Sequence, residues 1–156
     1  MNIKQLITVN IEEVPNIELK IWNDGWQTEK VLTNVAIGKE GATTNKIEGD
    51  LKTPLGLFKL GSAFGNKQLQ TNYPYLIITD NSYWIDDLMS PYYNKWIEVG
   101  EQKQIKNTWE TAEHLIEYPE YRLGFIIEYN TENQYDELNK GNNKGSAIFL
   151  HLKTKD

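Results

Sequence analysis

The stretch Gly145-Ser146-Ala147-Ile148-Phe149-Leu150-His151 says more about the fold than any other part of this chain. In an extended strand, successive side chains point to opposite faces of the sheet. Ile148 and Leu150 therefore share one face, and Phe149 and His151 share the other. Apolar residues on both faces predict a strand in the core of a sheet, over residues 146–152. His151 lies at its end, where an imidazole can reach a site at the sheet edge.

Alternating apolar and polar residues recur upstream and favour a chain built mainly of strands. Residues 5–10 and 17–22 show this alternation, and Asn23-Asp24-Gly25 supplies a hairpin turn because Asp-Gly tolerates positive φ. Residues 30–38 are predicted as the third strand of this meander. Later strands are predicted over residues 55–60, 75–79 and 122–130, with a long aromatic loop over 81–94.

One segment carries the signals of a helix. Asn107 can cap its start, Glu110 follows three residues later as in a capping box, and Pro119 stops it. Its apolar residues recur at helical spacing: Trp109, Ala112, Leu115 and Ile116. We therefore predict a mainly β sandwich with one clear helix at about residues 108–118.

Composition narrows the classes of function. The length of 156 residues predicts a single domain spanning 1–156. A net charge of −6 without a basic run argues against nucleic-acid binding, and no apolar stretch has the length of a membrane span. The chain contains no cysteine, so thiol catalysis, disulfides and thiolate metal sites are excluded within it. Two histidines on different elements predict no metal site, and no cofactor motif is present.

Carboxylates offer a weaker alternative chemistry. Asp86 and Asp87 form the one adjacent pair in a plausible cleft loop, but neighbours on an extended segment point to opposite faces. A glycosidase needs two facing carboxyl groups, so turn and cap roles are favoured for both residues. Asp50 and Lys52 precede Pro54 and either end a turn or form the wall of a substrate groove.

Several segments together resemble the L,D-transpeptidase catalytic domain family, which cross-links bacterial peptidoglycan. The resemblance extends across nearly the whole chain after residue 35, in order and in spacing. It is carried by Glu48–Phe58, Gly61–Gly65, Tyr83–Asp87, Ser90–Asn94, Trp109…Ala112-Glu113, Ile127–Asn130 and Gly145–His151.

The resemblance implies a β-sandwich enzyme in which a cysteine thiolate attacks a stem-peptide carbonyl next to a terminal D-alanine. His151 matches the histidine that acts in general base catalysis, and backbone N–H groups around the cysteine would form the oxyanion hole. We predict Asp50, Lys52, Trp84 and Tyr129 as substrate-binding residues. Peptidoglycan stem peptides are the expected partner.

The missing nucleophile leaves two functional hypotheses open. In the first, the chain is most of an L,D-transpeptidase domain that ends before the cysteine-bearing turn, and it is inactive as it stands. In the second, it is a non-catalytic module that binds a cell-wall peptide or a protein. The family implies the cell envelope, although the segment from Met1 to Val9 is too polar for a signal peptide.

Overall fold

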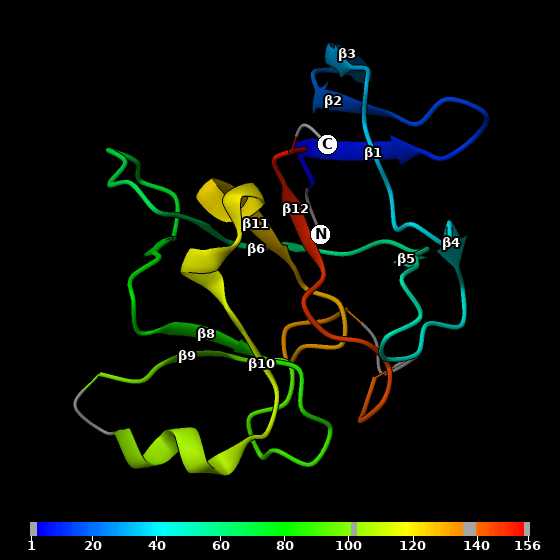
Figure 1. The fold of residues 1–156 in the computed structure, drawn as a ribbon. Coiled ribbons are helices and arrows are strands. Elements are labelled where there is room, and N and C mark those ends of the chain that lie inside the picture. The colour runs from blue at the N-terminus through cyan, green and yellow to red at the C-terminus, as the bar shows by residue number, and fades with distance from the viewer. Residues whose placement is uncertain (1–2, 101–102, 136–139, 155–156) are drawn as a thin grey trace. The chain divides into compact units, whose positions relative to one another are not determined.

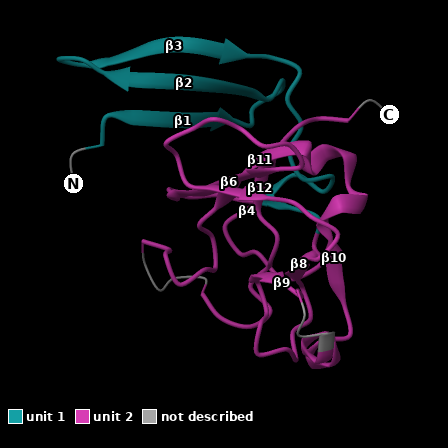
Figure 2. Ribbon diagram, turned by 90° about the vertical axis from the view of Figure 1, so that its left-hand side faces the viewer, with its two compact units in different colours: residues 1–42, 51–53 teal, residues 43–50, 54–156 magenta. Residues whose placement is uncertain are grey.

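The computed structural model describes residues 3–100, 103–135 and 140–154 (Figure 1). The described chain is mainly β, as predicted. It divides into two compact units (Figure 2). Unit 1 comprises residues 1–42 and 51–53, and unit 2 comprises residues 43–50 and 54–156.

Unit 1 contains the meander predicted for the amino-terminal part of the chain. Strands β1 (Gln5–Asn10), β2 (Asn16–Trp22) and β3 (Trp26–Leu32) form one antiparallel sheet in that order. The first two predicted strands are confirmed, but β3 begins four residues before the predicted start at residue 30. The cause is a tight turn: Asp24 has a φ of 53°, and Trp22 pairs directly with Trp26. The two indole rings meet edge to face with centroids 5.4 Å apart.

The strand predicted over residues 55–60 is wrong. The short strands β4 (Ala42–Thr43) and β5 (Thr53–Pro54) pair with each other, and the next strand, β6, starts only at Leu60. The chain leaves the extended conformation at Gly56, whose φ of 153° is readily adopted only by glycine. A Cβ on Gly56 would also lie 2.7 Å from the Phe58 ring, which folds back over this bend.

Unit 2 holds two larger sheets. Their strands are β6 (Leu60–Gly65), β7 (Tyr75–Ile77), β8 (Ser82–Ile85), β9 (Trp96–Glu98), β10 (Ala112–His114), β11 (Leu123–Ile127) and β12 (Phe149–His151). In the first sheet, β11 pairs antiparallel with both β6 and the edge strand β12, and β7 runs parallel to β6 at the opposite edge. In the second sheet, β8 lies between β9 and β10, and both pairings are antiparallel.

Aromatic side chains from both sheets form the core of unit 2. Phe64 of β6 is fully buried, and its ring contacts those of Trp96, Tyr121 and Phe149. Phe149 also meets Trp84 of β8, with ring centroids 4.8 Å apart. Burying one such side chain contributes about 1.5–3 kcal/mol, so this cluster holds the two sheets face to face. Phe149 is half-buried and packs against this core.

The helix predicted at residues 108–118 is wrong. Residues 112–114 form β10, and around it lie only short 3₁₀ helices: η1 (Lys103–Thr108), η2 (Leu115–Glu117) and η3 (Pro119–Arg122). Two contacts between residues that lie far apart in the sequence outweigh the capping signal. The Glu110 N–H donates to Asp87 Oδ2 at 2.7 Å, and His114 stacks on Tyr83, its partner across the β8–β10 pair. Cross-strand pairing therefore overrides local helix propensity here.

Candidate functional site

His151 is exposed at the end of β12, directly opposite Gly124 of β11. Its Nδ1 lies 2.9 Å from the carbonyl oxygen of Leu152. A carbonyl only accepts, so Nδ1 carries the proton in this contact, and in the neutral ring Nε2 keeps its lone pair. The side chain thus presents a basic nitrogen at the edge of the sheet.

The ring of Tyr121 packs beside His151. The two rings meet edge to face with centroids 5.5 Å apart, and Tyr121 is buried among Phe64, Phe149 and Tyr118. Its hydroxyl donates to Glu113 Oε2 at 2.8 Å. Burial, followed by the nearby negative charge of Glu113, raises the pKa of Tyr121 far above its ordinary value.

Glu113 lies in an acidic environment. Burial is the main cause that raises its pKa to about 7, the Tyr121 hydrogen bond opposes this, and three neighbouring carboxylates raise the pKa further. Those neighbours are Asp86, Glu120 and Glu48. The Oδ1 atom of Asp86 is buried without a hydrogen-bond partner among the described residues. Glu113 is therefore a carboxyl group that changes its charge near neutral pH.

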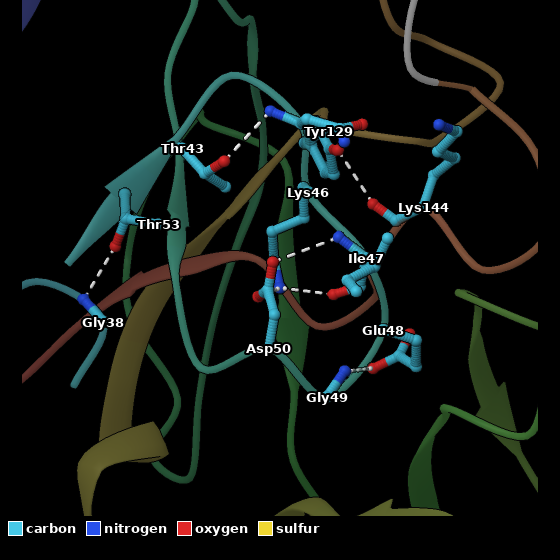
Figure 3. Close-up of polar contacts among 12 residues, drawn as sticks. Gly38, Thr43, Lys46, Ile47, Glu48, Gly49, Asp50, Thr53, Tyr129 and Lys144 are labelled. Carbon is cyan, nitrogen blue, oxygen red and sulfur yellow. Dashed lines mark hydrogen bonds and ion pairs between the residues drawn. The ribbon is translucent and has the colours of Figure 1, made fainter. Parts of the chain in front are cut away.

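Asp50 lies in a turn that contains a buried ion pair (Figure 3). The Lys46 ammonium lies 2.5 Å from Asp50 Oδ1 and also donates to the Ile47 carbonyl at 3.2 Å. Asp50 Oδ2 accepts the Ile47 N–H at 3.1 Å. Since the two charged side chains are only 6% and 10% exposed, Asp50 closes this turn rather than facing solvent.

The same turn is joined to two loops of unit 2. Glu48 accepts a hydrogen bond of 2.5 Å from the Tyr93 hydroxyl, which belongs to the aromatic loop after β8. Gly145, in the loop before β12, lies so close to Lys46 that a Cβ there would come within 2.8 Å of its side chain. Burial and the Glu48 contact raise the pKa of Tyr93 well above its ordinary value. The three segments therefore form one loop cluster.

Asn94 is the buried centre of this loop cluster. Its Oδ1 accepts the Trp84 indole N–H and the Ala147 N–H, both at 3.1 Å. Its Nδ2 donates to the carbonyl oxygens of Tyr129 at 3.2 Å and Asn130 at 2.9 Å. The φ of 58° at Asn94 suits asparagine, which tolerates this conformation better than most residues. One side chain thus satisfies four groups from three chain segments.

Tyr129 completes the loop cluster. Its hydroxyl donates to the Lys144 carbonyl at 2.8 Å (Figure 3), and its ring packs edge to face on Phe58. Burial and the negative charge of Asp50 raise the pKa of Tyr129 to about 12. The hydroxyl therefore stays protonated at neutral pH and serves as a donor. Next to it, Asn130 donates to the carbonyls of Gly141 and Gly145.

The structure brings together three of the five predicted site residues. Asp50, Trp84 and Tyr129 all belong to the loop cluster, although Trp84 and Tyr129 are only 3% exposed. His151 lies at the other end of the β11–β12 pair. It faces Gly124, five residues before Tyr129, which corresponds to roughly 15 Å along an extended chain. Lys52 belongs to unit 1 and is half-buried.

The remaining polar candidates have structural contacts. Asp87 accepts the N–H groups of Met89 and Glu110, and these hydrogen bonds hold the pKa of its carboxyl below its ordinary value. His114 lies between Glu117 and the Asp80 carbonyl and stacks on Tyr83. Asp87 thus caps a turn, and its two backbone contacts leave it poorly placed as a glycosidase carboxylate.

Sequence reasoning missed Lys46, Asn94, Glu113 and Tyr121. The i,i+4 spacing of Lys46 and Asp50 was a usable signal, because oppositely charged residues at that spacing can meet across a turn. Asn94 gives no comparable signal, since its four partners come from distant segments.

Comparisons with known proteins leave the family of this chain open. No family model matches it, and neither a curated protein nor a solved structure does. Within the described residues, no three histidine, aspartate or glutamate side chains are grouped so that they could hold a metal ion. No helix in the same part of the chain has the length and apolar character needed to cross a bilayer.

Proposed function

We propose that this chain is an L,D-transpeptidase-type domain that binds peptidoglycan stem peptides, with His151 in the position of the general base. The observation that carries the proposal is the state of His151. Its ring is exposed at the end of the edge strand β12, and Nδ1 donates to the Leu152 carbonyl. The resemblance over residues 48–151 supplies the substrate class.

The geometry suits proton transfer from a thiol. With the proton on Nδ1, Nε2 of His151 can accept a thiol proton and leave a thiolate to attack a carbonyl carbon. The 156 residues contain no cysteine, so that thiol must come from residues outside them. We therefore expect this polypeptide to bind a stem peptide without releasing D-alanine from it.

Binding of a stem tetrapeptide that ends in D-alanine tests the proposal. We expect the peptide to shift the His151 ring-proton resonances in NMR spectra, while His114 stays unchanged because it lies on β10 with its own partners. A matched peptide that ends in L-alanine is expected to bind more weakly. Equal binding of both peptides, or an unmoved His151 signal, would contradict the proposal.

A second experiment tests the role given to His151. A turn of the Thr-x-Gly-Cys type, added after Asp156, is expected to give D-alanine release that thiol reagents block. The matched control carries serine in place of the added cysteine and should be inactive. Retained activity after His151→Ala would show that His151 is not the base.

A non-catalytic binding module is the second candidate, and the absence of cysteine from the chain favours it. Its ligand is a cell-wall peptide or a protein; in the first case it shares the ligand with the first candidate, but it predicts no turnover from the chain with the added cysteine. The two candidates are therefore separated by that chain, while the tetrapeptide titration tests what they have in common.

A further inference from the structure

We propose that Glu113 is a positioning residue for His151, acting through the hydroxyl group of Tyr121. The proposal rests on the general-base role proposed for His151 and concerns the regulation of that same site. Neither Glu113 nor Tyr121 was among the residues that the sequence predicted for the site. The contacts that support the proposal lie within unit 2.

The first contact is between two rings. His151 meets Tyr121 edge to face, with centroids 5.5 Å apart and an angle of 77° between the ring planes. The one polar contact found for the imidazole within the described residues is that of Nδ1 with the adjacent Leu152 carbonyl. The Tyr121 ring packs beside the imidazole and restricts its rotation about the Cβ–Cγ bond on that side, and so restricts the direction of Nε2.

The second contact anchors Tyr121. Packing with Phe149 and Tyr118 restrains the ring at its sides, and the hydroxyl at its far end donates to Glu113 Oε2 at 2.8 Å. Tyr121 belongs to η3, whereas Glu113 belongs to β10 of the other sheet. This hydrogen bond thus links the element beside His151 to the second sheet.

The third observation concerns charge. Glu113 is surrounded by negative or neutral groups: Asp86 after β8, Glu48 in the turn before β5, Glu120 in η3, and the Tyr118 and Tyr121 hydroxyls. Since the groups that act on its pKa include no cation, ionisation of Glu113 adds a negative charge among carboxylates. The Tyr121 hydroxyl is the group that favours the ionised form.

These contacts make the hydrogen bond that holds Tyr121 sensitive to the protonation of Glu113. An ionised Glu113 accepts a charge-assisted hydrogen bond, which is shorter and stronger than the bond to a neutral carboxyl group. The pKa of Glu113 is raised to about 7, so the strength of the hydrogen bond between Tyr121 and Glu113 changes near neutral pH. The restraint on His151 is accordingly tightest when Glu113 is ionised.

NMR titration of the whole 156-residue chain tests the proposal without any ligand. We expect the His151 ring-proton shifts to show an inflection with pH that follows the carboxyl carbon of Glu113. Glu113→Gln keeps an acceptor for the Tyr121 hydroxyl but cannot ionise, so this inflection should vanish. Tyr121→Phe keeps the ring but removes the hydroxyl, and the same inflection should be lost.

The double variant and His114 provide the controls. If Glu113 acts through Tyr121, adding Glu113→Gln to Tyr121→Phe should change the His151 curve no further. His114, which stacks on Tyr83, should give the same ring-proton signals in every variant at each pH. His151 curves that stay unchanged in both folded single variants would overturn the proposal, even where thermal stability falls, because that result indicates a structural role only.

The outcome is independent of the substrate. A stem tetrapeptide that fails to bind would refute the proposed function and leave the coupling between Glu113 and His151 measurable. Conversely, a bound peptide together with a His151 curve that ignores Glu113 would refute only the positioning role.

Discussion

The two ends of β12 are held in different ways. Ahead of the strand, the loop cluster is fixed by buried polar contacts: the Lys46–Asp50 ion pair and the four hydrogen bonds of Asn94. At the other end, His151 rests against a tyrosine ring whose hydroxyl is bound to one titratable carboxyl group. The contacts at the loop end are therefore expected to keep the same strength across neutral pH, whereas the contacts at the histidine end should change in strength with pH.

Breaking the buried ion pair should have the largest effect. Lys46→Met leaves the Asp50 charge in the interior without its partner, and we expect a loss of about 3 kcal/mol in the free energy of unfolding. Urea denaturation measures this loss.

The matched control is Lys20→Met, which breaks the ion pair with Glu18 in unit 1. Those two side chains are 27% and 34% exposed, so the expected loss is below about 1 kcal/mol. Equal losses at the two sites would mean that the loop cluster is no more tightly held than an ordinary surface.

The pH dependence of stability should show the next effect. Because folding raises the pKa of Glu113 from 4.5 to about 7, the folded state keeps a proton that the unfolded chain loses. Stability should therefore fall as pH rises from about 4.5 through about 7, by about 3 kcal/mol in all, and Glu113 should contribute no further change once it is ionised in both states. Thermal denaturation at a series of pH values measures this contribution.

The Glu113→Gln variant isolates that contribution, because its amide does not titrate. We expect its stability curve to be flatter than that of the unaltered chain between those pH values. Identical slopes for the two proteins would show that Glu113 titrates alike in the folded and unfolded states.

Removing one hydroxyl at the loop end should have the smallest effect. Tyr129→Phe deletes the hydrogen bond to the Lys144 carbonyl and should cost about 1 kcal/mol at any pH between 5 and 8, because a carbonyl does not titrate. Tyr121→Phe, at the histidine end, should cost more at pH 8 than at pH 5, where Glu113 is protonated. A pH-dependent loss in the Tyr129 variant would contradict the contrast between the two ends.

Local patterns predicted strands where apolar and polar residues alternate. Strands β1 and β2 follow from this period-two alternation, and the turn between β2 and β3 follows from Asn23-Asp24-Gly25. The predicted helix failed because His114 and Glu110 find partners across other elements, and no spacing rule reveals those partners.

The sequence predicted single residues of the candidate site but not the contacts between them. His151 was found as a polar residue ending an apolar strand. Asn94 and Tyr121 matter because of contacts with segments far away in the sequence, such as the one between Asn94 and Ala147. Of the two readings that the sequence left open for Asp50, the turn is visible in the structure, where Lys46 binds its carboxylate.

The indole pair of unit 1 provides an optical reporter. Trp22 and Trp26 meet edge to face and are 46% and 42% exposed, whereas Trp84, Trp96 and Trp109 belong to unit 2. Two indoles at such short range couple their electronic transitions, which produces a circular dichroism couplet in the ultraviolet. The loss of this couplet on heating would report the melting of the meander alone. A change in the fluorescence quenching of the buried Trp84 would report the melting of unit 2.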